Sequence, residues 1–478
     1  MAQFIHKFKL AAFVCLIILV GVSAQAQEKI TLQNAVDYAL QRNLTIKQAQ
    51  ITEQLAQADY NQSKFNQLPS VNASPQGSYN FGRSVNLATY SYSNQASLYV
   101  AGSANVSVTL FQGGQLRNQI LENKLTLDAD KSATAKVRND LILNVVTDYL
   151  SILTSQDLVT AAKQQIDIAN QTMDKANISY KVGNMTAADL AQAQAQVSTA
   201  TYNLTTAQNQ LDLSILVLKQ YMEMDPKTQI IVEKPDISKL QNVRTAFDAN
   251  EVVSTALSVN PDVKLAESQQ ATYQQAIKIA KGAYYPTVTL FGSLGTSYSN
   301  LLSTQVVGTT QVTVPVGVVS GTNQIVNTTV SQPIYAPYSM FGQFGNNFNQ
   351  AIGLNVQIPI FNKHSARTGV TKATLNFNNA ALTTQIAKNN LSKTITQAVL
   401  DLQAADKQYQ SAIQTFNSNK AALNVTKQRY DVGLVNTLDY NTSLTNYNKS
   451  QNDMIQAQYT VIFRSKIIDY YLGNTITL

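Results

Sequence analysis

Two acidic side chains stand where they could either cap a helix or form a charged ring. Asp189 lies three residues after Thr186, and Asp439 lies three residues after Asn436. This is capping-box spacing, in which the first side chain accepts the backbone N–H of the acid and the acid bonds back. Such a cap stabilises a helix by about 1 kcal/mol. The alternative is a ring of carboxylates where several copies of the chain meet, and one residue can serve in both roles.

No constellation of residues in the sequence predicts catalysis. The two histidines, His6 and His364, are far apart, and a lone histidine is seldom a ligand. Neither a phosphate-binding loop nor a Gly-x-Ser-x-Gly motif occurs. Cys15 is the only cysteine and lies in the apolar N-terminal run, which excludes disulfides and cysteine-held metals from the mature chain. We therefore expect no enzyme activity, no cofactor and no bound metal.

Two glycines ahead of the acids predict sharp returns between helices. Residues 180–183 read Tyr-Lys-Val-Gly, and residues 430–433 read Tyr-Asp-Val-Gly. Glycine accepts the left-handed conformation that ends many helices, because it has no Cβ atom. We expect Gly183 and Gly433 to form these turns, with Thr186 and Asn436 starting the helices that follow.

The segments on either side of these turns are very long and contain neither glycine nor proline, which are poor in helix interiors. Apolar residues within them recur at alternating steps of three and four, the period of helices wrapped around partners. As a helix, residues 115–182 would span about 100 Å at roughly 1.5 Å per residue. We expect four long helices, over residues 115–182, 185–222, 365–431 and 436–471.

These helices belong to an internal duplication. The turn motif at 180–183 recurs at 430–433, whereas the earlier motifs Ala39-Leu40-x-x-Asn43 and Leu68-Pro69 recur at 256–260 and 285–286, at a smaller offset. The larger offset of the later motif indicates an insertion in the second repeat, and the Gly/Thr/Asn/Val-rich stretch 299–345 fits one as a long loop. We divide the chain into a first repeat at 27–240, a linker or equatorial region at 223–250 and a second repeat at 249–472.

Segments of alternating polarity predict two strands in each repeat. They lie at about 71–111 in the first repeat, and at 287–298 and 348–361 in the second. The alternation is typical of a membrane barrel wall, although a soluble sandwich with one buried face gives the same period. Four strands cannot close in lipid, and closure needs at least about eight, so several chains would have to share one barrel. Aromatic residues that could form its girdle are Tyr79, Phe81, Tyr90, Tyr92 and Tyr99.

The N-terminus predicts a secretory signal at residues 1–26. Lys7 and Lys9 precede an apolar run, and the small residues before Gln27 place cleavage between Ala26 and Gln27. The chain is weakly charged, with 13% charged residues against roughly 25% in soluble domains. Its formal charge of +7 is scattered without a Lys/Arg block, so we expect no nucleic-acid partner.

The sequence resembles the TolC-like outer-membrane efflux proteins over residues 27–472. The resemblance rests on the duplicated layout and on the motif Tyr-x-Val-Gly-x-x-(Thr/Asn)-x-x-Asp, present at 180–189 and at 430–439. It implies a mixed α and β fold: a membrane β-barrel with four strands per chain, closed by oligomerisation and continued into a long antiparallel α-helical coiled-coil barrel. It further implies a homotrimer in the outer membrane that extends into the periplasm, with a periplasmic adaptor and an inner-membrane pump as partners. The function it implies is the exit duct for efflux or type I secretion.

The resemblance also implies that the turns form a periplasmic tip that gates the duct. Asp189 and Tyr430 match the positions that help hold this tip closed in the family, and Asp439 and Tyr180 are their counterparts in the other repeat. The chain departs from the family at Val435, where relatives carry a basic residue, and at Thr442, where they carry a second acid. These departures predict a weaker or differently built lock.

Two other functions fit parts of the pattern. A passive outer-membrane porin would need only short periplasmic turns, so the long helices disfavour it. A structural coiled-coil envelope protein would have an unbroken heptad rod and no paired strand segments.

Overall fold

The structure is a computed structural model and describes residues 28–86, 91–234 and 244–474. The mixed α and β class predicted from the sequence is confirmed. The chain divides into two compact units, one comprising residues 1–56, 125–270 and 379–478, and the other residues 57–124 and 271–378. Each unit draws on both repeats, so the duplication does not correspond to two separate domains. The predicted signal peptide, with Ala26 and Gln27, lies outside the described residues.

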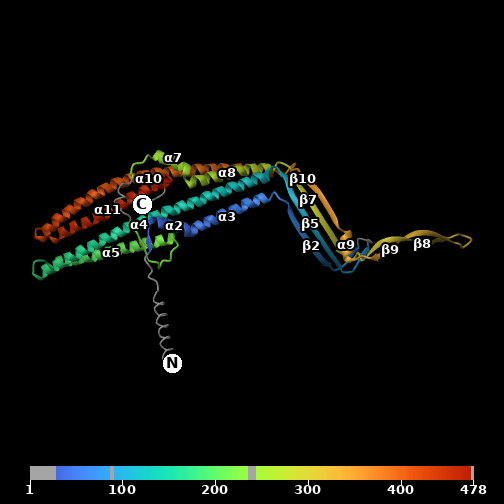
Figure 1. The fold of residues 1–478 in the computed structure, drawn as a ribbon, viewed down its shortest axis with the longest axis horizontal. Helices are drawn as coiled ribbons and strands as arrows, with labels where there is room; N and C mark the ends of the chain where they lie inside the picture. The colour runs from blue at the N-terminus through green and yellow to red at the C-terminus, as the bar shows by residue number, and fades with distance from the viewer. Residues whose placement is uncertain (1–27, 87–90, 235–243, 475–478) are drawn as a thin grey trace, which may run out of the picture. The chain divides into compact units, whose positions relative to one another are not determined.

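Four long helices show the duplication directly. α4 (Gln115–Lys181) and α10 (Ser365–Asp431) each have 67 residues, and α5 (Ala187–Tyr221) and α11 (Thr437–Tyr471) each have 35. They form two helical hairpins, α4–α5 and α10–α11 (Figure 1). In the first unit α11 is joined to α4 by the Tyr459 hydroxyl, 2.8 Å from Asp157, and to α10 by an Arg464–Asp401 ion pair of 3.1 Å.

Two short helices precede the strands in each repeat, and an asparagine joins them. α2 (Leu32–Arg42) is followed by α3 (Leu44–Phe65), and α7 (Ala249–Val259) by α8 (Pro261–Gly282). The Asn43 side chain accepts the N–H of Thr45 at 2.9 Å, and the Asn260 side chain accepts the N–H of Asp262 at the same distance. An amide oxygen that caps the second helix explains why asparagine stands at both positions.

Each repeat has a hydrophobic core of its own in the first unit. In the first repeat α2, α4 and the end of α5 bury Ile152, Leu153 and Leu218 against the strands β1 (Glu28–Ile30) and β6 (Ile230–Val232), which pair in parallel. In the second repeat α7, α8 and α10 bury a cluster that includes Ile395 and Leu402. Both clusters take residues from α11, so this helix contributes to the two cores.

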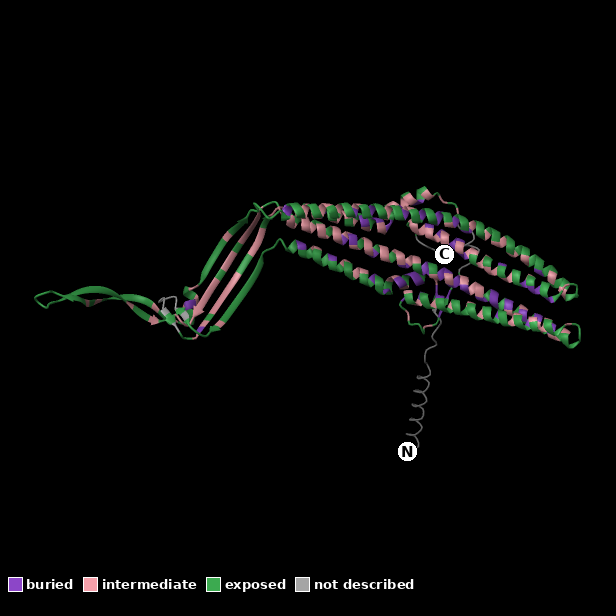
Figure 2. Ribbon diagram, turned by 180° about the vertical axis from the view of Figure 1, so that it is seen from behind, coloured by how far each residue is buried: buried purple, intermediate pink, exposed green. Residues whose placement is uncertain are grey.

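The second unit contains an antiparallel sheet in the order β10-β7-β5-β2. Its strands are β2 (Ser70–Asn80), β5 (Ser97–Gln112), β7 (Thr287–Ser299) and β10 (Asn349–Gln357). The outer strands β2 and β10 are largely exposed, whereas β5 and β7 are mostly half-buried (Figure 2). β10 ends before the predicted end at 361, because Pro359 has no N–H to offer the ladder. A short hairpin, β3 (Ser84–Asn86) with β4 (Ser91–Ser93), lies between β2 and β5.

The loop predicted for residues 299–345 is wrong. The segment forms a two-stranded antiparallel ribbon, β8 (Thr304–Val318) with β9 (Ile325–Pro337), and a short helix, α9 (Met340–Asn346). The register shifts at Gly308 and Gly317 interrupt the alternation along β8. Glycines at bulges read as loop residues in sequence, whereas the Val and Thr residues between them favour strands.

The strand-to-helix turn is the same in both repeats but differs in composition. Gly113 and Gly114 have positive φ angles of 56° and 74°, and Lys363 and His364, at the equivalent positions of the second repeat, have 55° and 61°. Gly113 also packs closely, because a Cβ at this position would stand 2.4 Å from the carbonyl oxygen of Gly282.

Among the described residues, no helix combines the length and the apolar character needed to cross a membrane.

Gln343 on α9 holds the base of the β8–β9 ribbon. Its side chain is fully buried; the amide nitrogen donates to the carbonyls of Ser299 (3.0 Å) and Leu302 (2.9 Å), and the amide oxygen accepts the N–H of Ser299 (2.9 Å). We predict that Gln343→Leu loosens this base, because each buried group left unpaired costs about 1–3 kcal/mol. Limited proteolysis should then cut near residues 299–303 faster than in the wild type. Equal rates in Gln343→Leu and in the control Gln332→Leu, at an exposed position on β9, would contradict this role.

The buried carboxylate of Asp148 on α4 predicts that the stability of the fold depends on pH. Its Oδ2 is buried and has no hydrogen-bond partner among the described residues, and burial raises the pKa of Asp148 to about 7. An acid whose pKa is higher in the folded than in the unfolded chain destabilises the fold as pH rises from about 4 to about 7. Asp148→Asn should therefore raise the denaturation midpoint at pH 8, and the gain should shrink toward pH 4. Asp167→Asn, at an exposed position of α4, should show no such trend.

Candidate functional site

The two helix turns have the same geometry. Gly183 and Gly433 have φ angles of 79° and 78°, in the left-handed region expected for them. The N–H of Gly183 donates to the carbonyl of Tyr180 (3.0 Å), and the next N–H, of Asn184, donates to that of Ser179 (2.9 Å). The same pair of bonds closes the second turn. This pair of backbone hydrogen bonds ends a helix and requires a residue in the left-handed conformation, so a side chain at either glycine would strain the turn.

Asp189 forms a complete capping box. The hydroxyl of Thr186 accepts the N–H of Asp189 (3.2 Å), and the carboxylate accepts the N–H (3.3 Å) and the hydroxyl (2.7 Å) of Thr186. These bonds, led by the Thr186 hydroxyl, lower the pKa of Asp189, and the side chain of Thr437 adds another. The carboxylate is thus held ionised at the start of α5 and reaches the start of α11.

Asp439 occupies the equivalent place with a simpler contact. The Asn436 side chain accepts the N–H of Asp439 at 2.8 Å and caps α11. Asparagine has no hydroxyl proton to give back to the acid, so the two caps differ in chemistry although they share their spacing. Asp439 is solvent-exposed and Asp189 is half-buried, and both stand at helix ends of one unit.

The two tyrosines of the turn motifs have different environments. The ring of Tyr430 stacks on that of Tyr440, with centroids 4.7 Å apart and 12° between planes. It packs against a small cluster that contains Leu423 and Leu444. Tyr180 is 43% exposed. The second-repeat tyrosine is therefore built into the hairpin, and its counterpart is not.

The structure brings the two hairpins together through residues that the sequence did not single out. The Lys175 ammonium on α4 lies 3.0 Å from the carboxylate of Asp431 on α10. Asp189 reaches the second hairpin through Thr437, and Ile168 of α4 packs against the second hairpin's cluster of Leu423, Tyr440 and Leu444. Lys175 and Asp431 are far apart in the sequence and belong to no motif that would link them, so only the tertiary structure reveals this pair.

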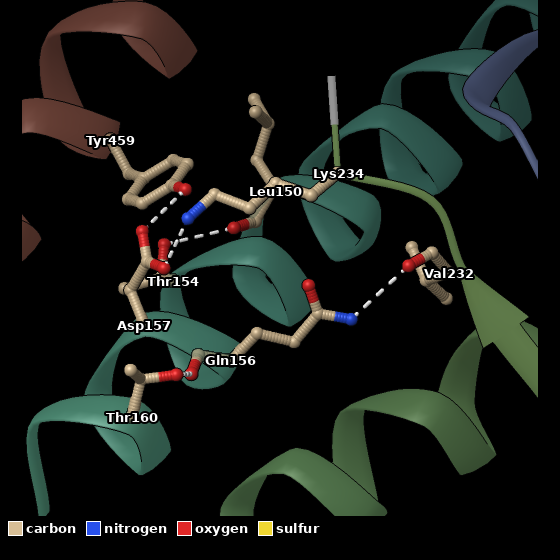
Figure 3. Close-up of polar contacts among 8 residues, drawn as sticks. All are labelled: Leu150, Thr154, Gln156, Asp157, Thr160, Val232, Lys234 and Tyr459. Carbon is tan, nitrogen blue, oxygen red and sulfur yellow. Dashed lines mark hydrogen bonds and ion pairs between the residues drawn. The ribbon is translucent and has the colours of Figure 1, made fainter. Parts of the chain in front are cut away.

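A second cluster ties the region after β6 to the long helices. Asp157 on α4 pairs with Lys234 and accepts the hydroxyl of Tyr459 on α11, and the Gln156 side chain donates to the carbonyl of Val232 at 3.2 Å (Figure 3). Burial, together with the adjacent Asp157, raises the pKa of Tyr459. Part of the predicted equatorial region, residues 235–243, lies outside the described residues.

Within the described ranges no group of three His, Cys, Asp or Glu side chains is arranged to hold a metal. What the turns offer is mechanical: two capped hairpins, joined by one ion pair, one carboxylate–hydroxyl contact and one aromatic cluster.

Of the predicted girdle residues, Tyr79 lies beside Phe81 (5.1 Å between centroids), and Tyr90 lies outside the described residues.

Comparisons with known proteins agree with this architecture. The chain is 23% identical over 442 residues to the toxin and drug export protein A of Aggregatibacter actinomycetemcomitans, covering 90% of this chain and 83% of that protein. It is 24% identical over 405 residues to the outer membrane protein TolC of Escherichia coli (strain K12), covering 81% and 73%. The structure of the Campylobacter jejuni CmeC outer membrane channel shares the fold, with a TM-score of 0.73 and 20% identity over 92% of this chain and 85% of that one.

The family-level match spans both repeats. The family described as outer membrane efflux protein matches residues 35–222 and 252–474, which excludes only the N-terminus, the linker and the last residues. Both turn motifs, all four long helices and all four strands of the sheet fall within these ranges. The chain belongs to the outer membrane efflux protein family.

Proposed function

We propose that three copies of this chain form an outer-membrane exit duct that receives substrates from a periplasmic adaptor and an inner-membrane pump. The observation that carries the proposal is the sheet with two free edges, β2 and β10. Open edges in lipid leave backbone groups unpaired, each at a cost of several kcal/mol, so a membrane sheet of four strands needs further copies to close it. The family relatives add the role, since one is named a toxin and drug export protein.

The long helices support the same assembly. On α5, Leu213 and Leu216 are 48% and 45% exposed, and on α10 Leu400 is 55% exposed. Leu216 is as far along the chain from its turn glycine, Gly183, as Leu400 is from its own, Gly433. Because helices rise equally per residue, the two leucines stand at the same height. An exposed apolar side chain on each of these two helices fits contact between neighbouring copies.

A disulfide tests this contact. Leu216→Cys with Leu400→Cys should form, on oxidation, covalent oligomers up to the trimer on a non-reducing gel, because Cys15 in the signal run is the only native cysteine. The matched control pairs Leu216→Cys with Val425→Cys. Val425 is exposed too but lies much nearer to its turn glycine, Gly433, so it stands at another height.

Mass determination in detergent completes the test. A monomer in detergent, together with unchanged drug sensitivity of a deletion strain, would overturn the proposed function. A trimer that conducts steadily without an adaptor would instead favour the passive porin.

We further propose that the two turns form the periplasmic gate, with Asp189 and Tyr430 holding it closed and Asp439 and Tyr180 beside them. Tyr430→Ala removes the stack on Tyr440 and the packing on the cluster with Leu423 and Leu444, so it should loosen the hairpin. Single-channel recordings should then show a larger mean conductance than the wild type. Tyr180→Ala is the matched control, because Tyr180 is exposed, and it should leave conductance near the wild-type value. Equal effects of the two substitutions would count against this gate.

A further inference from the structure

The register of the four-stranded sheet separates its side chains cleanly by chemistry. Residues paired directly across antiparallel strands point to the same face. The pairs Asn72–Asn105 and Asn105–Ser293 therefore lie on one face, and Val71–Val106 and Leu290–Leu354 on the other. The polar face carries Asn72, Ser74, Ser103, Asn105, Ser293 and Asn355. The apolar face carries Val71, Val106, Leu290, Leu294, Ile352 and Leu354.

Neither face carries a charge. No Asp, Glu, Lys, Arg or His occurs between Gly282 and Asn362, and Arg83 is the only one between Phe65 and Leu116. Arg83 lies outside all four strands, so every residue of β2, β5, β7 and β10 is uncharged. The chain has 35 Lys and Arg and 28 Asp and Glu residues, which it places elsewhere.

One aromatic residue on the polar face is accommodated against the sheet. Phe291 pairs with Gly353, and its Cζ atom lies 2.8 Å from the point where a Cβ of Gly353 would stand. The ring thus lies over the glycine. In the same row the hydroxyls of Ser70 and Ser107 are 3.1 Å apart. The face is therefore a surface of hydroxyl and amide groups with Phe291 lying against it.

In a barrel within lipid, the apolar face must point outward and the polar face toward the lumen. We infer that this lumen admits solutes through neutral hydrogen bonding and does not sort them by charge. The inference rests on the proposed trimeric duct and names its substrate class: solutes rich in hydroxyl or amide groups, whatever their net charge. Hydroxyls and amides both donate and accept, so they can exchange partners with water, whereas rings of fixed charge select ions by sign.

Adjacent residues on opposite faces test the orientation. Asn105→Cys should react with a charged, membrane-impermeant thiol reagent in outer-membrane vesicles, and Val106→Cys should not. Labelling of Val106→Cys alone would overturn the face assignment. The trimer is checked in parallel samples by the Leu216–Leu400 disulfide, in protein without a cysteine at 105 or 106, so a misplaced face is distinguished from a failed assembly.

Solute flux tests the absence of charge selection. In liposomes holding the trimer with Tyr430→Ala, which opens the proposed gate, glucose, gluconate and glucosamine should pass at rates within about twofold of one another, because a neutral lumen does not distinguish their charges. Asn105→Asp should slow gluconate relative to glucosamine, and Asn105→Lys should do the reverse. Thr322→Asp, in the turn of the β8–β9 ribbon, is the control and should change neither ratio.

Two outcomes separate the claims. Charge sorting that persists after Asp189→Asn and Asp439→Asn remove the acids at the turns would overturn the neutral lumen while leaving the duct in place. A protein that is monomeric in detergent and whose deletion leaves drug sensitivity unchanged would overturn the proposed function, and the lumen assignment with it.

Discussion

The constraint on which the rest depends is the hydrogen bonding of strand edges in lipid. Each chain supplies four strands in one antiparallel sheet, and the outer two, β2 and β10, have one unpaired side each. Water can satisfy such edges, but hydrocarbon cannot. A sheet of this kind becomes a stable membrane wall only when identical copies complete its ladders. The proposed trimer also sets the helices of neighbouring copies side by side, in agreement with the exposed leucines on α5 and α10.

The duplication gives the protein two versions of each part, and the differences between them are informative. Both turns need a left-handed glycine, and both following helices need a side-chain cap. The first cap is a full threonine–aspartate box, and the second is an asparagine. The first tyrosine is exposed, whereas the second is stacked and packed. The two repeats therefore meet the same backbone requirements at their turns, but they differ in cap residue and in the packing around the tyrosine.

Charged residues are distributed unevenly between the helices and the sheet. Most ion pairs of the described residues lie between helices or within one, among them Lys175–Asp431 and Arg464–Asp401, and the four strands of the sheet hold none because they have no charged residue. Surface ion pairs of this kind contribute little stability each, so their value is in fixing register between helices. An uncharged sheet, in contrast, has no ionised group to desolvate at its lipid face.

By itself the sequence determined the long helices, the glycine turns and the duplication, because these follow from local backbone requirements and periodicity. It also indicated the protein family, through the two turn motifs. It also placed the caps, since capping depends on residues three positions apart. It did not determine the β8–β9 ribbon, because bulge glycines resemble loop residues. Nor did it determine the Gln343 anchor, the Asp157–Lys234–Tyr459 cluster or the packing of Tyr430. Those depend on contacts between distant segments, and only the tertiary structure decides which distant groups meet.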